Sequence, residues 1–183
     1  MKALETERLI LRKFSPDDFA ALYSFVSRPQ NTIYTFFWPS FEEETRTFIS
    51  SSIKKAEDVP CEDFQYAAVT KANNTLIGSC NFLLSGVGGS NIGWIVSSDY
   101  WKHGYGTEMG KAMLRLGFEE LNFQRIIACC DAENIGSWRV MEKIGMRREG
   151  LFLDCRRAHK QSKKGYSDEV TYAILRDEWE SLS

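Results

Sequence analysis

The sequence lacks an apolar run long enough to span a bilayer, and it lacks an excess of charge of either sign. Its 183 residues carry 23 lysines and arginines against 25 aspartates and glutamates, which gives a formal net charge of −2. A balance this even provides no global attraction to nucleic acid or to an anionic membrane. The first residues, from Met1 to Arg8, include acids where a signal peptide has its apolar stretch. We therefore expect a cytoplasmic protein that contacts no membrane and binds no nucleic acid directly.

The sequence also lacks a regular cysteine pattern. The five cysteines are odd in number, and no two are spaced as Cys-x-x-Cys. Cys129 and Cys130 are adjacent, and adjacent strand residues point to opposite faces of a sheet. We therefore expect no disulfide framework, no zinc site and no other metal site. We interpret all five as buried apolar residues: Cys61, Cys80, Cys129, Cys130 and Cys155.

No internal repeat or linker interrupts the chain. With 43% hydrophobic and 26% charged residues, 183 residues suffice for one well-buried core and are few for two domains. We expect one domain, residues 1–183.

The most informative segment runs from Tyr100 to Glu108 and joins a strand to a helix through a glycine-rich turn. The segment before it, Asn91 to Val96, is typical of an apolar strand. Gly104 and Gly106 let the backbone turn sharply and expose successive N–H groups, at the positive end of the helix dipole. This pattern predicts a site for an anion such as a phosphate. The helix is indicated by apolar residues that recur on one face: Met109, Ala112, Met113, Leu116 and Leu121.

Two familiar phosphate motifs do not fit this loop. A P-loop ends in Gly-Lys-Ser/Thr, whereas Thr107 and Glu108 follow Gly106 here. A dinucleotide fingerprint has its third glycine where this chain has Met109, and Gly110 comes one place late. A glycine turn that merely starts a helix is the remaining alternative.

The loop resembles the Gln/Arg-x-x-Gly-x-Gly/Ala motif of the GCN5-related N-acetyltransferases, with Trp101 at the Gln/Arg position. It is most similar to the ribosomal-protein alanine acetyltransferase branch of that family. Leu4 to Phe14 resembles the opening strand of this branch. Asn134 to Met146 resembles its Asn-x-x-Ser helix, which ends in Glu-Lys-x-Gly-Phe/Met. These three motifs occur in the family's order and cover nearly the whole chain.

The predicted elements alternate between strands and helices, so the fold class is α/β. The resemblance implies a mixed, mostly antiparallel sheet of about seven strands, splayed between the fourth and fifth strands, with about four helices. Asn73 and Asn74 separate two strands and predict a hairpin turn. The expected strands are 8–13, 64–70, 76–84, 91–97, 125–130, 146–155 and 168–175, and the expected helices are 16–26, 41–55, 106–121 and 135–144.

The resemblance implies acetyl-coenzyme A (acetyl-CoA) as cosubstrate. Its pantetheine arm would pair with the fourth strand in the gap of the splay, and its pyrophosphate would meet the loop N–H groups. Lys102 and His103 would add charge-assisted contacts, unless they are simply solvated. The expected contacts are Ile95, Val96 and Ser97 for the arm, and Lys102, His103, Gly104, Tyr105, Gly106 and Thr107 for the pyrophosphate.

The same resemblance assigns some of the chemistry. The amide near Val96 would bind the oxyanion. Many members protonate the leaving thiolate from a tyrosine, but Met141 occupies that position. Ser137 stands where the ribosomal branch places a serine proposed as that donor, although it also suits a small residue on a helix. Asn134 suits a helix cap, a coenzyme contact or both.

The proton acceptor is not marked by the family pattern. Many relatives read Glu-Ile-Gly-Tyr in the fourth strand, whereas this chain has Asn91, and an amide cannot take a proton. Asp154, near the expected substrate opening, is the replacement candidate, with a solvated surface acid as the alternative. Water as proton acceptor also stays open.

The acceptor is only weakly marked. An aromatic cluster lies where the family usually walls the acceptor cleft, and it predicts either acceptor contacts or core packing. The basic loop 156–164 suits an acidic partner or a solvated hairpin tip. The cluster comprises Tyr34, Phe36, Phe37 and Trp38, of which Tyr34, Phe37 and Trp38 are the predicted substrate contacts.

The sequence thus predicts an acetyl-CoA-dependent N-acetyltransferase, a monomer or homodimer, that acts on a primary amine such as a protein amino terminus. The alternative is a non-catalytic CoA-binding module of the same fold, because the family's tyrosine and glutamate are both missing.

Overall fold

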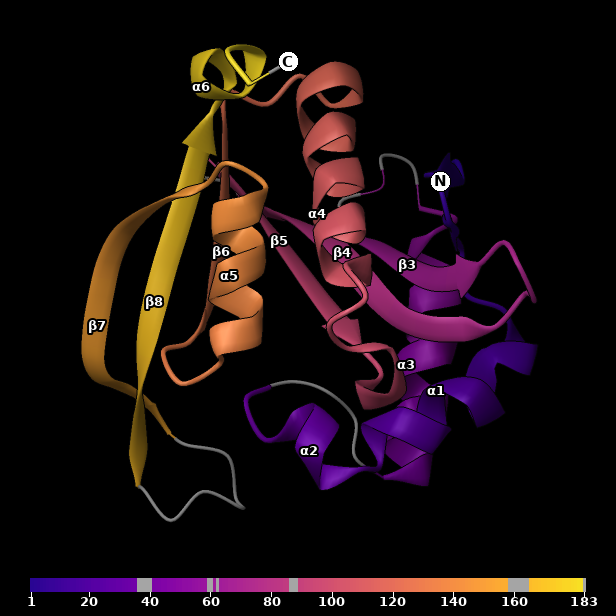
Figure 1. Ribbon diagram of the computed structural model, residues 1–183. Coiled ribbons are helices and arrows are strands. Elements are labelled where there is room, and N and C mark those ends of the chain that lie inside the picture. The colour runs from indigo at the N-terminus through magenta and orange to yellow at the C-terminus, as the bar shows by residue number, and fades with distance from the viewer. Residues whose placement is uncertain (36–40, 59–60, 62, 86–88, 158–164, 183) are drawn as a thin grey trace.

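The computed structural model describes residues 1–35, 41–58, 61, 63–85, 89–157 and 165–182. Its strands form a single twisted sheet in the order β1-β2-β3-β4-β5-β6-β8-β7 (Figure 1). Neighbouring strands are antiparallel except β5 and β6, which are parallel. The strands are β1 (Leu4–Glu5), β2 (Leu9–Arg12), β3 (Asp63–Thr70), β4 (Leu76–Ser85), β5 (Gly89–Val96), β6 (Arg125–Asp131), β7 (Arg147–Arg157) and β8 (Tyr166–Leu175).

Helices cover both faces of the sheet, as Figure 1 shows: α4 and α5 lie in front, and α1 and α3 lie behind β3 and β4. A π-helical turn, Leu116–Glu120, extends α4. Short 3-10 turns precede α1 (Pro16–Asp18) and follow β5 (Ser98–Tyr100). The α-helices are α1 (Phe19–Val26), α2 (Pro29–Thr32), α3 (Glu42–Lys55), α4 (Tyr105–Arg115), α5 (Ile135–Lys143) and α6 (Arg176–Glu180).

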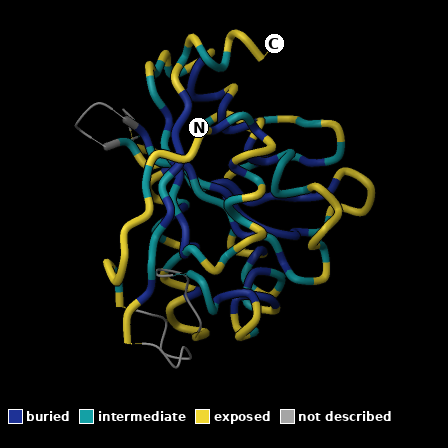
Figure 2. The backbone as a smooth tube through the Cα atoms, turned by 60° about the vertical axis from the view of Figure 1, so that its left-hand side comes forward, coloured by how far each residue is buried: buried dark blue, intermediate teal, exposed yellow. Residues whose placement is uncertain are grey.

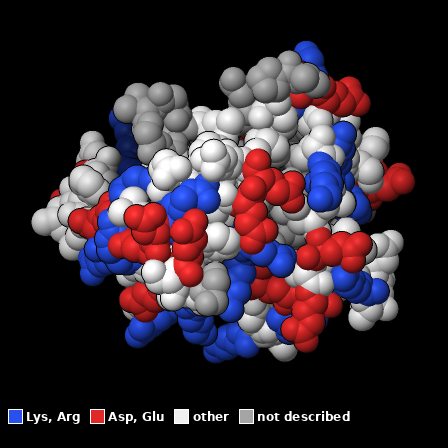
Figure 3. Space-filling model, turned by 90° about the horizontal axis from the view of Figure 1, so that it is seen from above, with Lys and Arg blue, Asp and Glu red and all other residues white. Residues whose placement is uncertain are grey.

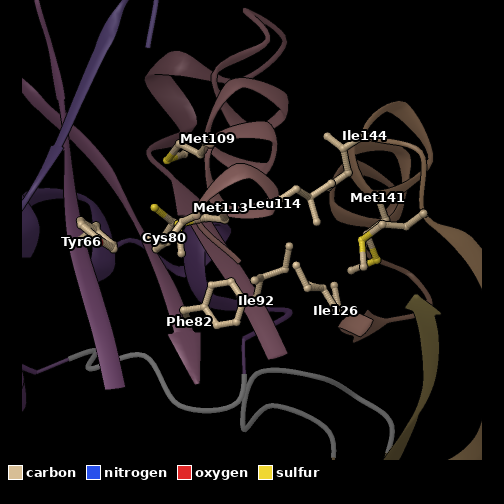
Figure 4. Packing of buried hydrophobic residues seen from close by; sticks show 14 of the residues in the cluster. Tyr66, Cys80, Phe82, Ile92, Met109, Met113, Leu114, Ile126, Met141 and Ile144 are labelled. Carbon is tan, nitrogen blue, oxygen red and sulfur yellow. The ribbon is translucent and has the colours of Figure 1, made fainter. Parts of the chain in front are cut away.

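The two layers of helices enclose two apolar cores. On the front face, α4 contributes Met109 and Met113, and α5 and its C-cap contribute Met141 and Ile144, to a cluster with the sheet residues Phe82, Ile92 and Ile126 (Figure 4). On the other face, α1 and α3 pack on strand residues such as Ala67, Val69 and Ile95. Burial of both faces is what holds the central strands between the two layers of helices.

The predicted α/β fold is confirmed: the described residues form eight strands and six α-helices, where about seven and about four were expected. The additional elements, β1, α2 and α6, contain two to five residues each, which is too short for a hydrophobic period to show. The hairpin turn is also confirmed, with Asn74 in the left-handed region at φ 54°.

The splay is confirmed between β5 and β6, which correspond to the fourth and fifth predicted strands, 91–97 and 125–130. These two strands pair only at Ser90 with Ile126 and at Asn91 with Ile127, at the start of each strand. Farther along, β5 continues to pair with β4 as far as Val96, and β6 continues to pair with β8 as far as Asp131. A gap therefore opens between the carboxyl-terminal halves of two parallel strands, at the centre of the sheet.

Strand β7 is a free edge of the sheet and its residues are mostly exposed, as the yellow tube in Figure 2 shows. Its pairing with β8 is interrupted between Phe152 and Arg156, where a bulge containing Asp154 projects from the sheet. Such irregularity protects an edge strand from pairing with other chains.

Seen from above, the end of the molecule that carries α6 shows acidic and basic side chains interleaved (Figure 3). Examples are the pairs Arg147 with Glu178, at 2.7 Å, and Arg176 with Glu180, at 3.6 Å. Alternating signs cancel at a distance greater than the Debye length, so this face provides no long-range attraction for a polyanion.

Candidate functional site

Helix α4 begins at a glycine that cannot cap it. Gly104 is the N-cap, in the left-handed region at φ 84°, and the first helical hydrogen bond runs from the Glu108 N–H to the Gly104 carbonyl at 3.0 Å. A glycine has no side chain to accept from the first-turn N–H groups, those of Tyr105, Gly106 and Thr107. Lys102, at φ 63°, lies in the loop before these N–H groups, and the residue is exposed to solvent. These donors and the helix dipole together favour an anion.

Gly106 allows α4 to approach both β5 and α5. A Cβ at this position would lie 3.3 Å from Val140 Cγ2, 3.9 Å from Val96 Cγ2 and 4.0 Å from Trp94 Cδ1. The start of α4 is therefore held against the last residues of β5, beside the gap, and any larger side chain would intrude there.

Arg8, directly before β2, fixes this loop from the other side. Its Nε and Nη2 atoms donate to Glu108 Oε2 at 2.8 and 2.7 Å, and its Nη1 donates to the His103 carbonyl at 3.0 Å. The guanidinium also lies 4.4 Å from the centre of the Tyr105 ring. A single planar side chain therefore contacts three residues of the loop and helix start, which is the kind of multidentate contact that arginine makes and lysine cannot.

Glu108 would be an unfavourable neighbour for a phosphate if its charge were free. Partial burial alone would raise the pKa of its carboxyl, but hydrogen bonds from Thr6, at 2.6 Å, and from the backbone and side chain of Arg8 outweigh this, and the net pKa is lowered. The carboxylate is thus ionised and neutralised by Arg8, so the anion site at the start of α4 is not opposed by it.

We expect Arg8→Lys to raise the Michaelis constant for acetyl-CoA several-fold and to leave turnover at saturation nearly unchanged. A lysine keeps the positive charge but cannot bridge Glu108 and His103 together, so the loop loses its fixed shape. Arg12→Lys is the matched control, because Arg12, at the end of β2, makes an equivalent two-bond pair with Asp18, at 2.7 Å for each bond. An equal effect of both variants would contradict a specific role for Arg8.

The same pair predicts a pH dependence of stability. Because the folded pKa of Glu108 is lowered, its contribution is fully present above the unfolded value of about 4.3 and is lost as the pH falls through the folded pKa. The difference in melting temperature between the wild type and Glu108→Gln should therefore be largest near pH 7 and should shrink towards pH 3. A constant difference across this range would exclude the ion pair as its cause.

The backbone of β5 presents unmatched groups to the gap. The Ser97 N–H donates to the Ile77 carbonyl of β4 at 2.8 Å, and backbone direction alternates along a strand. Ile95 and Ser97 therefore face β4, whereas Trp94 and Val96 face the gap, beyond the last pair with β6. Of the three predicted pantetheine contacts, only Val96 directs its backbone groups into the gap. Trp94, which was not predicted, directs its backbone groups to the same side. The alternation of backbone direction along a strand could have shown, from the sequence alone, that Trp94 and Val96 share one side.

Trp101 occupies part of this edge. Its indole Nε1 donates to the Val96 carbonyl at 2.7 Å, and the Trp101 carbonyl lies 2.7 Å from the Nδ1 atom of His103. The side chain at the family's Gln/Arg position thus closes the end of β5. The Val96 N–H and the Trp94 backbone groups stay directed into the gap.

Helix α5 lies in front of β6, on the opposite side of the gap from β5 (Figure 1). Asn134 is its N-cap, with Oδ1 accepting from the Ser137 N–H at 3.2 Å, so the predicted capping role is confirmed. The Ser137 hydroxyl is near the Cys130 thiol and hydrogen-bonds it. Burial raises the pKa of Cys130 to about 12, so this thiol is a neutral neighbour of Ser137. Met141, in the next turn, is buried in the front core at 1% exposure.

Helix α2 is fixed at the end of β5, although sequence analysis did not detect it. The buried Asn31 accepts from the Ser98 N–H at 2.8 Å and donates to the Phe25 carbonyl at 2.7 Å. Arg28 donates to both carboxylate oxygens of Asp99, at 2.9 and 2.8 Å. Tyr34, a predicted substrate contact, is half-buried in the turn after α2. Phe36, Phe37 and Trp38 lie outside the described residues.

A polar cluster lines the back face of the sheet beside the gap. Asn91 Nδ2 lies 3.8 Å from the Cys129 thiol, and Arg156 Nη2 lies 3.6 Å from the same sulfur. Arg156 also forms an ion pair with Glu169. Sequence analysis missed Glu169 and read Arg156 as part of a basic loop. Only the pairing of β6, β7 and β8 brings these residues together.

Asp154 and the cysteines are the remaining features for which the sequence made predictions. Asp154 lies in the bulge of β7 at φ 46°, exposed to solvent, with its N–H donating to Asp168 Oδ1 at 2.9 Å. Cys80 and Cys130 are buried as predicted, but Cys155 is exposed, so the interpretation of all five cysteines as buried was wrong. The reason is that β7 is an edge strand, which the sequence pattern did not show.

Comparison with known proteins shows the family. A model of the acetyltransferase (GNAT) domain matches residues 8–147. The chain belongs to the GNAT acetyltransferase family. It is 36% identical to an uncharacterized N-acetyltransferase, YnaD, of Bacillus subtilis, over 96% of this chain and 98% of that protein.

Solved structures agree with this assignment. A GNAT-family acetyltransferase from Bacillus anthracis is 34% identical and superposes with a TM-score of 0.82, over 96% of this chain and 99% of that one. A ribosomal-protein alanine acetyltransferase from Vibrio fischeri shares the fold at 16% identity, with a TM-score of 0.79 over 98% and 99% of the two chains. This GNAT protein is thus an acetyltransferase, and acetyl-CoA is the acetyl donor of its family.

None of the helices in the described part of this GNAT chain is long and apolar enough to cross a membrane.

Proposed function

We propose that the protein transfers the acetyl group of acetyl-CoA to a primary amine by direct attack of the amine on the thioester. The observation that carries the proposal is the gap between β5 and β6, with the uncapped start of α4 at its edge. One long ligand with an anionic end and an amide-bearing arm fits both features.

The residues around the gap suit acetyl-CoA. The N–H groups of Tyr105, Gly106 and Thr107 would receive the pyrophosphate, with the exposed Lys102 and His103 beside them. The amide-bearing pantetheine arm would pair with the gap-facing backbone of Trp94 and Val96, whose groups β6 does not satisfy. Ile95 and Ser97 would support this edge through their bonds to β4, and Gly104 through the turn, while Asn134 would border the arm from α5.

The chemistry then needs an oxyanion donor and a proton for the thiolate. The Val96 N–H is directed into the gap and is our choice for the oxyanion. The Ser137 hydroxyl, on the first turn of α5, is our choice to protonate the departing thiolate. The neutral Cys130 thiol of β6 is its neighbour. For the proton acceptor, the sequence offers Asp154 as a candidate, directly or through a water, and it leaves water alone as the alternative.

The acceptor would approach beside α2. Tyr34 lies in the turn after this helix, which Asn31 and Arg28 hold at the end of β5, and Phe37 and Trp38 follow it in the sequence. Aromatic side chains grip a peptide end or an apolar amine through their faces. A protein amino terminus is therefore the acceptor that we place first, as expected also for members named for ribosomal-protein alanine acetylation.

A panel of acceptors tests this proposal. The purified protein is incubated with acetyl-CoA and with peptides that have free amino termini, peptides whose only amine is a lysine side chain, and small primary amines. Mass spectrometry identifies the acetylated product. We expect turnover with at least one amine and the highest kcat/KM with an amino-terminal peptide. Binding of acetyl-CoA without any acetylated product across the panel would favour the non-catalytic module instead.

A further inference from the structure

On the basis of the proposed function, we propose that Glu169 of β8 receives the proton of the acceptor amine. Residue Asn91 stands where many relatives carry a glutamate in β5, and an amide cannot take a proton. Glu169 is an acid that sequence analysis did not consider, and its side chain is 13% exposed in the structure. It would supply from β8 the carboxylate that β5 lacks.

The strand register places Glu169 level with the proposed reaction centre. Asn91 of β5 is opposite Ile127 of β6. Four residues farther along each of these parallel strands are Ile95 and Asp131, and Asp131 is paired with Glu169. Glu169 therefore lies on β8, one strand beyond the β6 edge of the gap, and its register along the strands is that of the end of β5 and the Val96 N–H, where the thioester would be bound.

The side-chain faces place Glu169 on the side away from the coenzyme loop. Paired residues and residues two apart in a strand share a face, so Cys129, Asp131 and Glu169 point to the same side of the sheet. Cys130, between two of them, points into the front core under α4 and α5. The contact between Asn91 and Cys129, at 3.8 Å, shows that the position of the missing glutamate is on this face too. An amine can thus arrive on the face opposite to the pyrophosphate.

Neighbouring acids are less suitable. Asp131 is buried at the end of β6, and its Oδ1 is engaged by the Glu133 N–H at 2.8 Å in the turn that leads to α5. Asp154 is on the exposed bulge of the edge strand. Glu169 has a guanidinium partner, Arg156, which also contacts the Cys129 thiol and so holds the carboxylate in place on this face of the sheet.

The step balances without a further reactant. The acceptor starts as an ammonium ion and loses two protons in all. One goes to the Glu169 carboxylate, directly or through one water, and frees the lone pair that attacks the thioester carbon. The C–S bond then breaks, the second proton passes to the thiolate through the Ser137 hydroxyl, and Glu169 returns its proton to solvent. The products are the acetylated amine, CoA and one proton.

The test is the pH profile of Glu169→Gln with the amine that gives the highest turnover in the panel. At pH 7 we expect kcat/KM to fall by about 100-fold to 10,000-fold, the range of general-base catalysis, with an unchanged dissociation constant for acetyl-CoA. The loss should shrink above the pKa of the acceptor amine, about 7.7–8.0 for an α-amino group, because solvent then removes the proton. Asn91→Glu in the Glu169→Gln background should recover part of the rate by restoring a carboxylate on the same face.

Glu149→Gln is the matched control, because Glu149 of β7 is also paired with an arginine, at 2.9 Å, but this partner, Arg125, is the first residue of β6, at the opposite end of that strand from Asp131. It should keep the wild-type profile. A Glu169→Gln profile parallel to that of the wild type, or the pH-dependent loss in Asp154→Asn instead, would overturn the proposal. If Glu169→Gln does not fold, Glu169→Asp is used instead, because it keeps the carboxylate but shortens the side chain by one methylene. Unchanged turnover of Glu169→Asp would also overturn the proposal. A wild type without acetylated product is a failure of the proposed function and is distinct from these results.

Discussion

Replacement of Gly106 by aspartate is expected to abolish acetyl-CoA binding while the protein stays folded. A Cβ at this position would lie 3.3 Å from Val140, and the carboxylate beyond it has two directions available: towards the apolar side chains of Trp94 and Val96, or towards the first-turn N–H groups. The first direction blocks the gap, and the second places a negative charge where the pyrophosphate would bind. Isothermal titration calorimetry should show no binding at coenzyme concentrations that saturate the wild type.

Two variants at the same position separate charge from bulk. Gly106→Asn has nearly the shape of aspartate without its charge, and Gly106→Ala adds only the Cβ, for which Val140 must move by a few tenths of an ångström. We expect binding to weaken in the order alanine, asparagine, aspartate, with circular dichroism spectra that match the wild type. A folded Gly106→Asp protein with near-normal affinity would show that the anion site is elsewhere.

The second large effect concerns Ser137. If its hydroxyl protonates the thiolate, Ser137→Ala should lower kcat by about tenfold to a thousandfold, with little change in coenzyme affinity. The loss is expected at the lower end of the range for acid catalysis if water can replace the hydroxyl. Full turnover of Ser137→Ala between pH 6 and 9 would show that Ser137 is only a small residue on α5 and does not donate the proton.

The burial of Met141 decides which variant can serve as a control for Ser137→Ala. Met141→Tyr, which restores the residue that many relatives use as donor, is not expected to rescue Ser137→Ala. Met141 is 1% exposed and packs among core residues such as Ile144 (Figure 4), and a larger ring there costs about 1–3 kcal/mol of overpacking. Ser137→Thr is the better control, because it keeps a hydroxyl at the same place, and it should retain most of the rate.

Local patterns in the sequence were sufficient to predict the strand, turn and helix that form the proposed coenzyme loop. The glycine turn, the strand before it and the apolar face of α4 are contiguous, so the hydrogen-bonding direction of residues 102–107 follows from the sequence order alone. The resemblance supplied the splay, which single-strand patterns do not show. Boundaries changed at α4, which ends at Arg115 and continues as a π turn.

The acceptor side could not be predicted in the same way because its residues come from separate strands. Asn91, Cys129, Arg156 and Glu169 belong to β5, β6, β7 and β8, and their proximity depends on the order β5-β6-β8-β7. Asp154 was chosen from its position in the sequence, which does not reveal a bulge at an edge. Arg8 was part of a recognised motif, but its contacts with Glu108 and His103 required the structure.

The account is tested most directly by a crystal structure of the protein with CoA bound. We predict pyrophosphate oxygens within hydrogen-bond distance of the N–H groups of Tyr105, Gly106 and Thr107, and a pantetheine arm that lies between β5 and β6 and pairs with the backbone of Trp94 and Val96. The thiol should then lie near the Ser137 hydroxyl. CoA bound outside the gap between β5 and β6, or a pyrophosphate that does not contact the start of α4, would contradict the account.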